Sequence, residues 1–263
     1  MSGTTGRWGR SGFVALVMAF VAAAPALAQE PANPDRWTFT FAPYLWAISL
    51  DGNARIRGVE ADVDVPFKDA VKDLSFGIMG IGRAKKGRFA INLNGLFLRT
   101  SPDEEVGRFK IDATSDLAQL GSSVSYEVLN YRFGEAASGR PLAFRLEPLV
   151  GARFNYLRLE LEVRDGPSVD EDETWVDPLV GALVNVDLAE NWLFTGEGNI
   201  GGFGLGSDFT WNLQGYLSYR MTLFGLPTTL SFGYRALSID YDHNEFKWDV
   251  VQQGPILGTS IQF

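Results

Sequence analysis

The sequence of 263 residues contains no cysteine. Disulfide frameworks and cysteine-ligated metal sites are therefore excluded, and the lack of free thiols suits an oxidising envelope compartment. Histidine is almost as rare, because His243 is the only one. A histidine-based hydrolase also needs a nucleophile and an orienting acid, and no serine flanks His243. We interpret His243 as a solvated loop residue and expect no catalytic residue, no metal and no cofactor.

Long hydrophobic runs are also missing, and the longest apolar segment near the N-terminus is too short for a spanning helix of ~20 residues. It is preceded by positive charges and followed by a small-x-small cleavage site: Arg7 and Arg10, then Phe13–Ala24, then Ala26-Leu27-Ala28. This order predicts a cleaved signal peptide over residues 1–28, rather than a retained membrane anchor, and a mature domain over 29–263. Since no cysteine follows, a lipoprotein anchor is excluded.

Positive charge is scarce in the predicted mature domain. The two arginines of the signal peptide leave 21 basic residues against 32 acidic ones, a net charge of −11. Nucleic-acid-binding proteins normally carry a basic surface. We therefore expect no nucleic-acid partner.

The sequence is 46% hydrophobic, with a mean hydropathy of −0.02. A membrane protein without apolar helices must be a closed β-barrel, because lipid offers no partner to unpaired backbone groups. Barrel strands alternate lipid-facing apolar and interior polar residues, which keeps the mean hydropathy near zero. Such alternation is the main signal in this chain, and residues 211–221 alternate apolar with polar or charged side chains throughout.

The alternating segments predict an all-β protein, a single antiparallel up-and-down transmembrane β-barrel of about ten strands. Eight or twelve strands are the alternatives, and residues 54–65 either form an outer hairpin or extend the barrel to twelve. Short connections alternate with long ones at 51–74, 101–117 and 164–172, which is typical of bacterial barrels. An even count places both termini in the periplasm. The ten predicted strands are 36–50, 75–86, 88–100, 118–133, 142–163, 173–188, 191–204, 208–222, 228–241 and 246–263.

The C-terminal strand ends on an aromatic residue. Leu257, Thr259, Ile261 and Phe263 share one face of this strand. The pattern resembles the terminal signal that the outer-membrane assembly machinery recognises in its substrates. It predicts an exported protein of the bacterial outer membrane.

Several short motifs extend the resemblance beyond this class. They are Tyr44-Leu45-Trp46-Ala47, the glycine-rich segment 201–211, Gly233-Tyr234-Arg235, Asp240-Tyr241-Asp242 and Gly254-Pro255-Ile256-Leu257-Gly258. Together they resemble a largely uncharacterised family of small, porin-like outer-membrane barrels from proteobacteria. The resemblance implies fold and location, and very little chemistry.

Alternation places four acids and four bases inside the barrel: Glu127, Glu147, Asp177 and Glu197, with Arg145, Arg153, Arg220 and Arg235. Equal numbers predict a charge-balanced network rather than a selectivity ring of one sign. Charges in a narrow lumen are costly unless they are paired. We expect Arg153 to pair with Asp177, and Glu197 to pair with Arg220 or Arg235.

Three other features have modest interpretations. Residues 196–201 match GxGxxG, but no helix follows, so we predict tight strand packing rather than a dinucleotide site. Phe67, Ala70, Val71 and Leu74 have helical spacing inside the first long loop. Acidic clusters at 103–105 and 165–173 would lie beside lipopolysaccharide phosphates, where they solubilise the loops or bind divalent cations diffusely.

Three classes of function follow. The favoured one is a non-enzymatic, monomeric barrel that is either a narrow pore or purely structural. The alternatives are an outer-leaflet enzyme that modifies lipid, and an adhesion protein that acts through acidic outer loops. The expected partners are outer-membrane lipids, lipopolysaccharide and the barrel-assembly machinery.

Overall fold

The computed structural model of the protein describes residues 35–56, 59–101, 103–106, 109–163 and 168–263. The predicted signal peptide, residues 1–28, lies outside the described residues. Among those residues, no helix is both long and apolar enough to cross a lipid bilayer.

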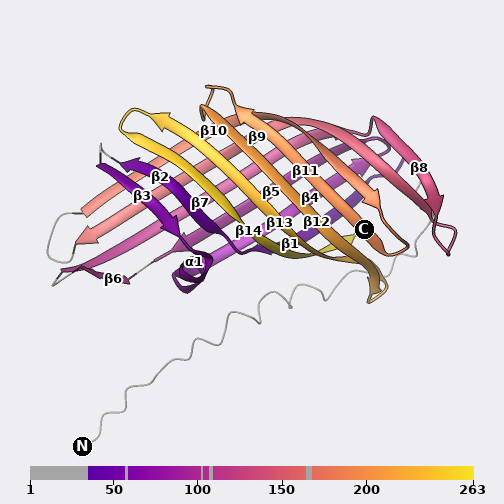
Figure 1. Cartoon of the computed structure of the whole chain (residues 1–263), viewed down its shortest axis with the longest axis horizontal. Coiled ribbons are helices and arrows are strands. Elements are labelled where there is room, and N and C mark those ends of the chain that lie inside the picture. Colours follow the sequence, from indigo (N-terminus) through magenta and orange to yellow (C-terminus); the bar gives the residue numbers. More distant parts are fainter. Residues whose placement is uncertain (1–34, 57–58, 102, 107–108, 164–167) are drawn as a thin grey trace, which may run out of the picture.

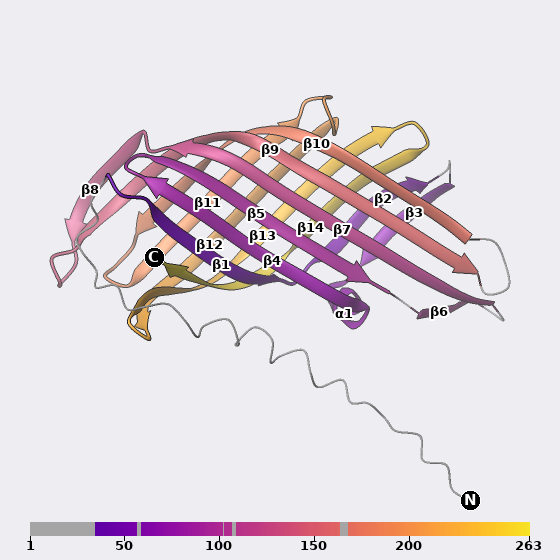
Figure 2. The ribbon, with the colours of Figure 1, turned by 180° about the vertical axis from the view of Figure 1, so that it is seen from behind.

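Ten antiparallel strands form a closed ring, because β1 pairs with both β4 and β14 (Figures 1 and 2). Around the ring the strands are β1 (Thr38–Trp46), β4 (Leu74–Lys86), β5 (Phe89–Thr100), β7 (Phe109–Tyr126), β9 (Pro141–Val163), β10 (Ser168–Asp187), β11 (Trp192–Gly202), β12 (Phe209–Leu223), β13 (Leu226–His243) and β14 (Phe246–Gln262). Each predicted strand overlaps one strand of this ring. The predicted ten-stranded barrel is confirmed.

Four further strands and a helix lie outside the ring: β2 (Ser49–Ile56), β3 (Val59–Val65), α1 (Phe67–Lys72), β6 (Asp103–Val106) and β8 (Leu129–Glu135). The predicted outer hairpin is β2–β3, and β2 pairs with residues 247–253 in the first half of β14. The helical spacing in the first long loop corresponds to α1. In Figure 1, β2, β3 and β6 lie at one end of the barrel and β8 lies at the other.

Two segments predicted as loops are partly strands. The segment 101–117 contains β6 and the start of β7, and the segment 164–172 contains the start of β10. Backbone pairing continues in these segments beyond the part of each strand that crosses the lipid. Residues outside the lipid need no apolar outward face, so they lack the alternation on which the prediction relied. The hairpins therefore project from the barrel as paired strands.

The two faces of the sheet differ as a membrane barrel requires. Side chains that point outward are large, apolar and exposed, such as Ile78 at 63% and Leu213 at 62%. Leu237 points inward and is fully buried. Trp192 and Tyr219 pack edge to face, with ring centroids 5.1 Å apart, beside the connections of only a few residues. Because such short turns face the periplasm in bacterial barrels, we call this end the periplasmic end and the opposite one the outer end.

Candidate functional site in the barrel lumen

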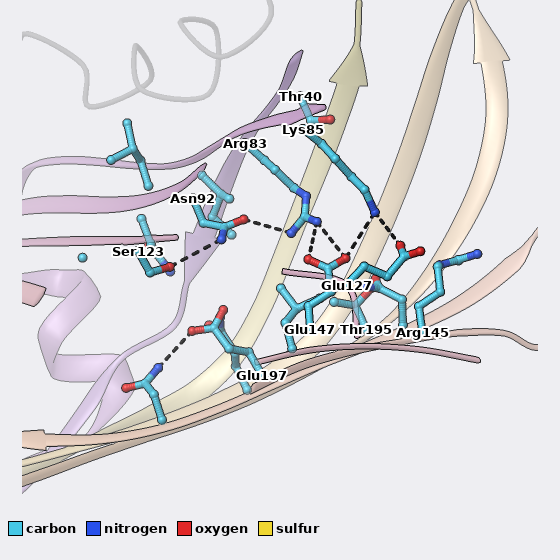
Figure 3. A pocket seen from close by; sticks show the side chains of 18 of the residues that line it. Thr40, Arg83, Lys85, Asn92, Ser123, Glu127, Arg145, Glu147, Thr195 and Glu197 are labelled. Atoms are coloured by element: carbon cyan, nitrogen blue, oxygen red, sulfur yellow. Dashed lines mark hydrogen bonds and ion pairs between the residues drawn. The ribbon is translucent and has the colours of Figure 1, made fainter. Parts of the chain in front are cut away.

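The periplasmic half of the lumen contains a cavity of about 980 Å³. Its lining comes from nearly every strand of the ring, and Figure 3 shows part of it. Eight of the lining residues are basic and three are acidic. The basic ones are Arg36, Arg83, Lys85, Arg88, Arg132, Arg145, Arg153 and Arg235, and the acidic ones are Glu127, Glu147 and Glu197.

Salt bridges cross the lumen near the mouth of the cavity (Figure 3). The guanidinium of Arg83, on β4, donates to Glu147 of β9 at 2.6 and 2.9 Å. The ammonium of Lys85 donates to Glu127 at 2.7 Å and lies 3.4 Å from Glu147. Burial alone would raise the pKa of Glu127, but hydrogen bonds from Lys85 and Asn130 outweigh it and lower that pKa. These contacts tie β4 to β9 and to the end of β7 across the inner face of the sheet.

A second cluster gathers around Asp187, which is nearly fully buried at the periplasmic end of β10. The guanidinium of Arg145 lies 2.8 Å from its carboxylate. Arg220 donates to the same carboxylate from β12. Asp187 thus forms salt bridges with two of the arginines expected inside the barrel.

Two arginines at the inner end of the cavity are paired with neutral groups. Arg153 donates to Thr210 at 3.1 Å and to Asn199 at 3.0 Å. Arg235 donates to Asn212 at 2.8 Å and to Tyr44 at 3.4 Å, and its guanidinium lies 4.4 Å from the ring centroid of Trp46. Both side chains are only 4% exposed.

The acid Asp177 fixes the loop between β11 and β12. Its carboxylate accepts the backbone N–H of Ser207 at 2.6 Å, the hydroxyl of Ser207 at 3.0 Å and the amide of Asn155 at 2.8 Å. A Cβ on Gly206 would lie 2.4 Å from the carbonyl oxygen of Val176, so glycine is required for this close approach. Asp177 therefore positions a loop and makes no salt bridge within the described residues.

The outer half of the lumen is apolar. Trp175 of β10 stacks on Tyr241 of β13, with centroids 4.2 Å apart and an angle of 14° between the rings. β11 and β12 lie between these strands in the ring but end below this level, so the stack joins β10 to β13 beside the loop of residues 203–208. The cluster around it, which we call the apolar layer, consists of Tyr44, Trp46, Ile48, Ala54, Leu96, Leu157, Trp175, Leu237, Ile239, Tyr241, Phe246, Trp248, Val250 and Ile256.

The structure places all eight sequence-predicted charges on the inner face, but it does not form the expected pairs. Arg153 lies opposite Asp177 in the register, yet each bonds elsewhere. Glu197 accepts from Asn199 and Gln214 instead of pairing with Arg220 or Arg235. Alternation predicts which face of the sheet a side chain occupies, but it does not predict which groups that side chain can contact. The neutral amides that act as partners were therefore not predicted.

Three functional side chains were missing from the sequence prediction. Arg83 and Lys85 have interior parity on β4, and Asp187 has it on β10. Each could have been found by extending the alternation to the ends of its strand. With the additional bases, the cavity lining is cationic rather than balanced.

The remaining predicted sites are located as follows. Phe263 stacks on Phe39 at 6.3 Å where β1 and β14 close the ring, and Leu257 faces outward. The GxGxxG segment lies on β11 with no helix after it, and a Cβ on Gly201 would lie 2.4 Å from the carbonyl oxygen of Pro178. His243 contacts the ring of Tyr241. Within the described residues, no group of three acidic or histidine side chains is arranged to hold a metal ion.

Several solved structures of outer-membrane proteins are similar to this chain. Ail, the attachment invasion locus protein of Yersinia pestis, has 11% identity and a TM-score of 0.34, over 86% of this chain and 98% of that one. Neisserial surface protein A has 12% identity and a TM-score of 0.34, over 86% and 97%. A FadL homologue of Pseudomonas aeruginosa has 10% identity and a TM-score of 0.25, over 86% and 89%. No protein-family model and no curated protein matches the sequence.

The closed ring leaves no sheet edge in contact with lipid, and its outward face is a continuous apolar surface. Three of the four connections between ring strands at the periplasmic end are short turns, the fourth carries β8, and longer hairpins project at the outer end, which is the pattern of bacterial barrels. The chain is an integral β-barrel protein of the bacterial outer membrane.

Proposed function

We propose that the protein is a non-enzymatic barrel with a blind vestibule open to the periplasm, and not a through-pore. The observation that carries this proposal is the apolar layer in the outer half of the lumen, whose buried side chains come from β1, β2, β5, β9, β10, β13 and β14. Of the two forms expected from the sequence, a narrow pore or a structural barrel, the apolar layer favours the second.

The packing of the apolar layer supports closure. Leu237 and Val250 have no exposed surface, and Ile239 is 1% exposed. Within this layer the amide of Gln252, which lies opposite Leu237 and is fully buried, is a polar group but carries no charge. An ion that crossed the layer would lose most of its hydration for few polar contacts, and dewetted apolar constrictions close channels in this way. Ten strands enclose more space than eight, which side chains alone just fill. Here aromatic rings occupy that additional space in the outer half.

Planar-bilayer recording from the purified protein tests closure directly. We expect no stable conductance steps from the wild type. Conductance should appear in the double variant Trp175→Ala/Tyr241→Ala, which removes two of the large rings of the apolar layer. The matched control is Trp192→Ala/Tyr219→Ala, an aromatic pair on the outward face. A stable conductance that is equal in the wild type and in both variants would disprove the proposal.

A second candidate is interaction with a surface partner through the projecting hairpins. A tilted strand crosses the hydrocarbon with ~9–11 residues, whereas β9 has 23 and β10 has 20. Replacing residues 160–170 by Asn-Gly would join the paired residues Leu159 and Glu171 through a two-residue hairpin turn. Loss of binding to host cells or matrix, with unchanged barrel assembly, would support this role.

The proposal includes the expected surroundings of a monomeric barrel. Outer-membrane lipid and lipopolysaccharide would contact the outward face, with diffuse divalent cations at the acidic hairpins. The assembly machinery would recognise the strand that ends in Ile261 and Phe263. An enzymatic role is tested by mass spectrometry of lipid A from cells with and without the gene, and we expect no difference.

A further inference from the structure

The cavity has the opposite charge to the chain that forms it. The predicted mature domain carries a net charge of −11, whereas the cavity lining has eight basic and three acidic residues. Salt bridges to Glu127, Glu147 and Asp187 offset the bases near the mouth. A concave surface of one sign, with low-dielectric walls, concentrates ions of the opposite sign. The vestibule is therefore built to attract anions from the periplasm.

The surplus charge lies deepest at Arg153 and Arg235. Neither makes a salt bridge with any described residue, although both are 4% exposed. Each guanidinium has five N–H donors, and the hydrogen bonds given above use two on each. The two groups lie close together, because they donate to Thr210 and Asn212, two positions apart on β12. The carboxylates of Asp177 and Glu197 also act on the charge of Arg153, without bonding to it. A buried charge that bonds to no carboxylate is costly, so an anion bound to the two guanidinium groups would stabilise this site.

An unpartnered amide lies in the same lining. Gln119 is 4% exposed, and neither its amide nitrogen nor its amide oxygen has a hydrogen-bond partner. Asn155, its register partner on β9, has an unpartnered side-chain oxygen. Buried polar groups are normally satisfied by protein, water or ligand. Gln119 thus points to a polar occupant of the cavity independently of the two arginines.

From these features we infer that the inner end of the vestibule is a binding site for an oxyanion, a carboxylate or phosphate group of a small periplasmic solute. Arg153 and Arg235 supply the charge and the paired N–H donors that match the oxygens of such groups. Gln119 supplies a further N–H. The cavity volume of about 980 Å³ accommodates an organic molecule of the size that ligand pockets usually hold.

Glu197 sets the strength of this site. Its carboxylate also lines the cavity, accepting 2.9 Å hydrogen bonds from the amides of Asn199 and Gln214. It would repel an anion held by the arginines. The site therefore predicts two opposite effects: removing an arginine weakens binding, and removing the charge of Glu197 strengthens it.

Isothermal titration of the folded barrel in detergent, with inorganic phosphate and with succinate, tests the inference. We expect one anion to bind at one site per barrel, and the better of the two distinguishes a phosphate solute from a carboxylate solute. Arg153→Gln and Arg235→Gln should each weaken binding about tenfold, and Glu197→Gln should strengthen it. Arg158→Gln, which removes a guanidinium outside the cavity, should change it less than about twofold.

A spectroscopic measurement covers the case in which an arginine variant fails to fold. Because Arg235 lies over Trp46, an anion at this site should change the fluorescence of Trp46. The change should be present in the wild type, larger at low anion concentration in Glu197→Gln, and lost in Trp46→Phe. The inference is wrong if neither anion binds at up to about 20 mM, in which case Gln119 and Asn155 hold only water. It is equally wrong if binding is the same in all variants.

Discussion

The inner face of the barrel differs between its periplasmic and outer halves, although the same strands form both. On β13 the inward residues change from Arg235 to Leu237, Ile239 and Tyr241 within one strand. On β9 they change from Arg153 and Asn155 to Leu157. The outward face changes in the opposite sense, because on β13 it passes from Leu230, Phe232 and Tyr234 to Ser238, Asp240 and Asp242.

The difference shows that buried side chains on the inner face are stabilised in two separate ways. In the periplasmic half, charged groups are stabilised by ion pairs and by an open cavity that admits water. In the outer half, large side chains fill the lumen and remove apolar area from water. A substitution that changes the polarity of an inner side chain should therefore cost a different amount of unfolding free energy in each half.

The largest effect is expected from a charge in the apolar layer. Leu237→Asp would bury a carboxylate among apolar side chains, and Arg235, two positions away on the same face, is held by Asn212 and Trp46. We expect a loss of about 4 kcal/mol of unfolding free energy. Denaturant unfolding in lipid vesicles measures it. The same change at Leu205, 79% exposed in the loop after β11, should alter stability by less than about 0.5 kcal/mol. Equal costs would show that the outer half is hydrated.

A smaller effect is expected in the periplasmic half. Glu147→Gln removes the carboxylate that Arg83 and Lys85 share, and should cost about 3 kcal/mol. This is the low end for a buried pair, because the cavity leaves Arg83 partly hydrated. The double variant Glu147→Gln/Arg83→Gln should recover part of the loss. If the double variant costs as much as the two single changes added together, the pair is not coupled.

A third substitution tests the boundary between the halves. Asp177→Asn replaces the acceptor that holds the backbone and hydroxyl of Ser207, and should cost about 2 kcal/mol. The loop between β11 and β12 should then become accessible to limited proteolysis. Asp172→Asn, an exposed acid on the same strand, is the matched control. If the loop remained resistant to proteolysis in Asp177→Asn, the close packing of Gly206 against Val176 would be sufficient to hold it.

Much of the fold could be predicted from alternation, because lipid imposes it on every spanning strand. All ten strands of the ring were located, including the short turn between β4 and β5. The strand ends were less accurate, since β7 and β10 continue into water, where no lipid selects apolar residues. Parity also identified the eight inner charges.

The arrangement within the lumen could not be predicted in the same way. Trp175 and Tyr241 lie 66 positions apart in the sequence, and their rings meet because β11 and β12 end below them. The pairing of Arg153 with Asn199 depends on side-chain reach across β10, which a pattern of alternating residues does not contain. The signal peptide remains a prediction from its composition.

The smallest effect is expected at the outer rim, where the comparison of the two halves no longer applies. Arg158 and Asp170 form a bidentate pair, with hydrogen bonds of 2.8 and 2.9 Å, which is shorter than several of the lumen contacts. Both side chains are well exposed, however, so water and salt screen their charges whether or not they are paired. Arg158→Gln should therefore leave denaturant unfolding unchanged within error, at low and at high salt. A measurable loss at low salt alone would mean that the rim carries a wider charge network, and that position in the lumen is not the only feature deciding which ion pairs stabilise this barrel.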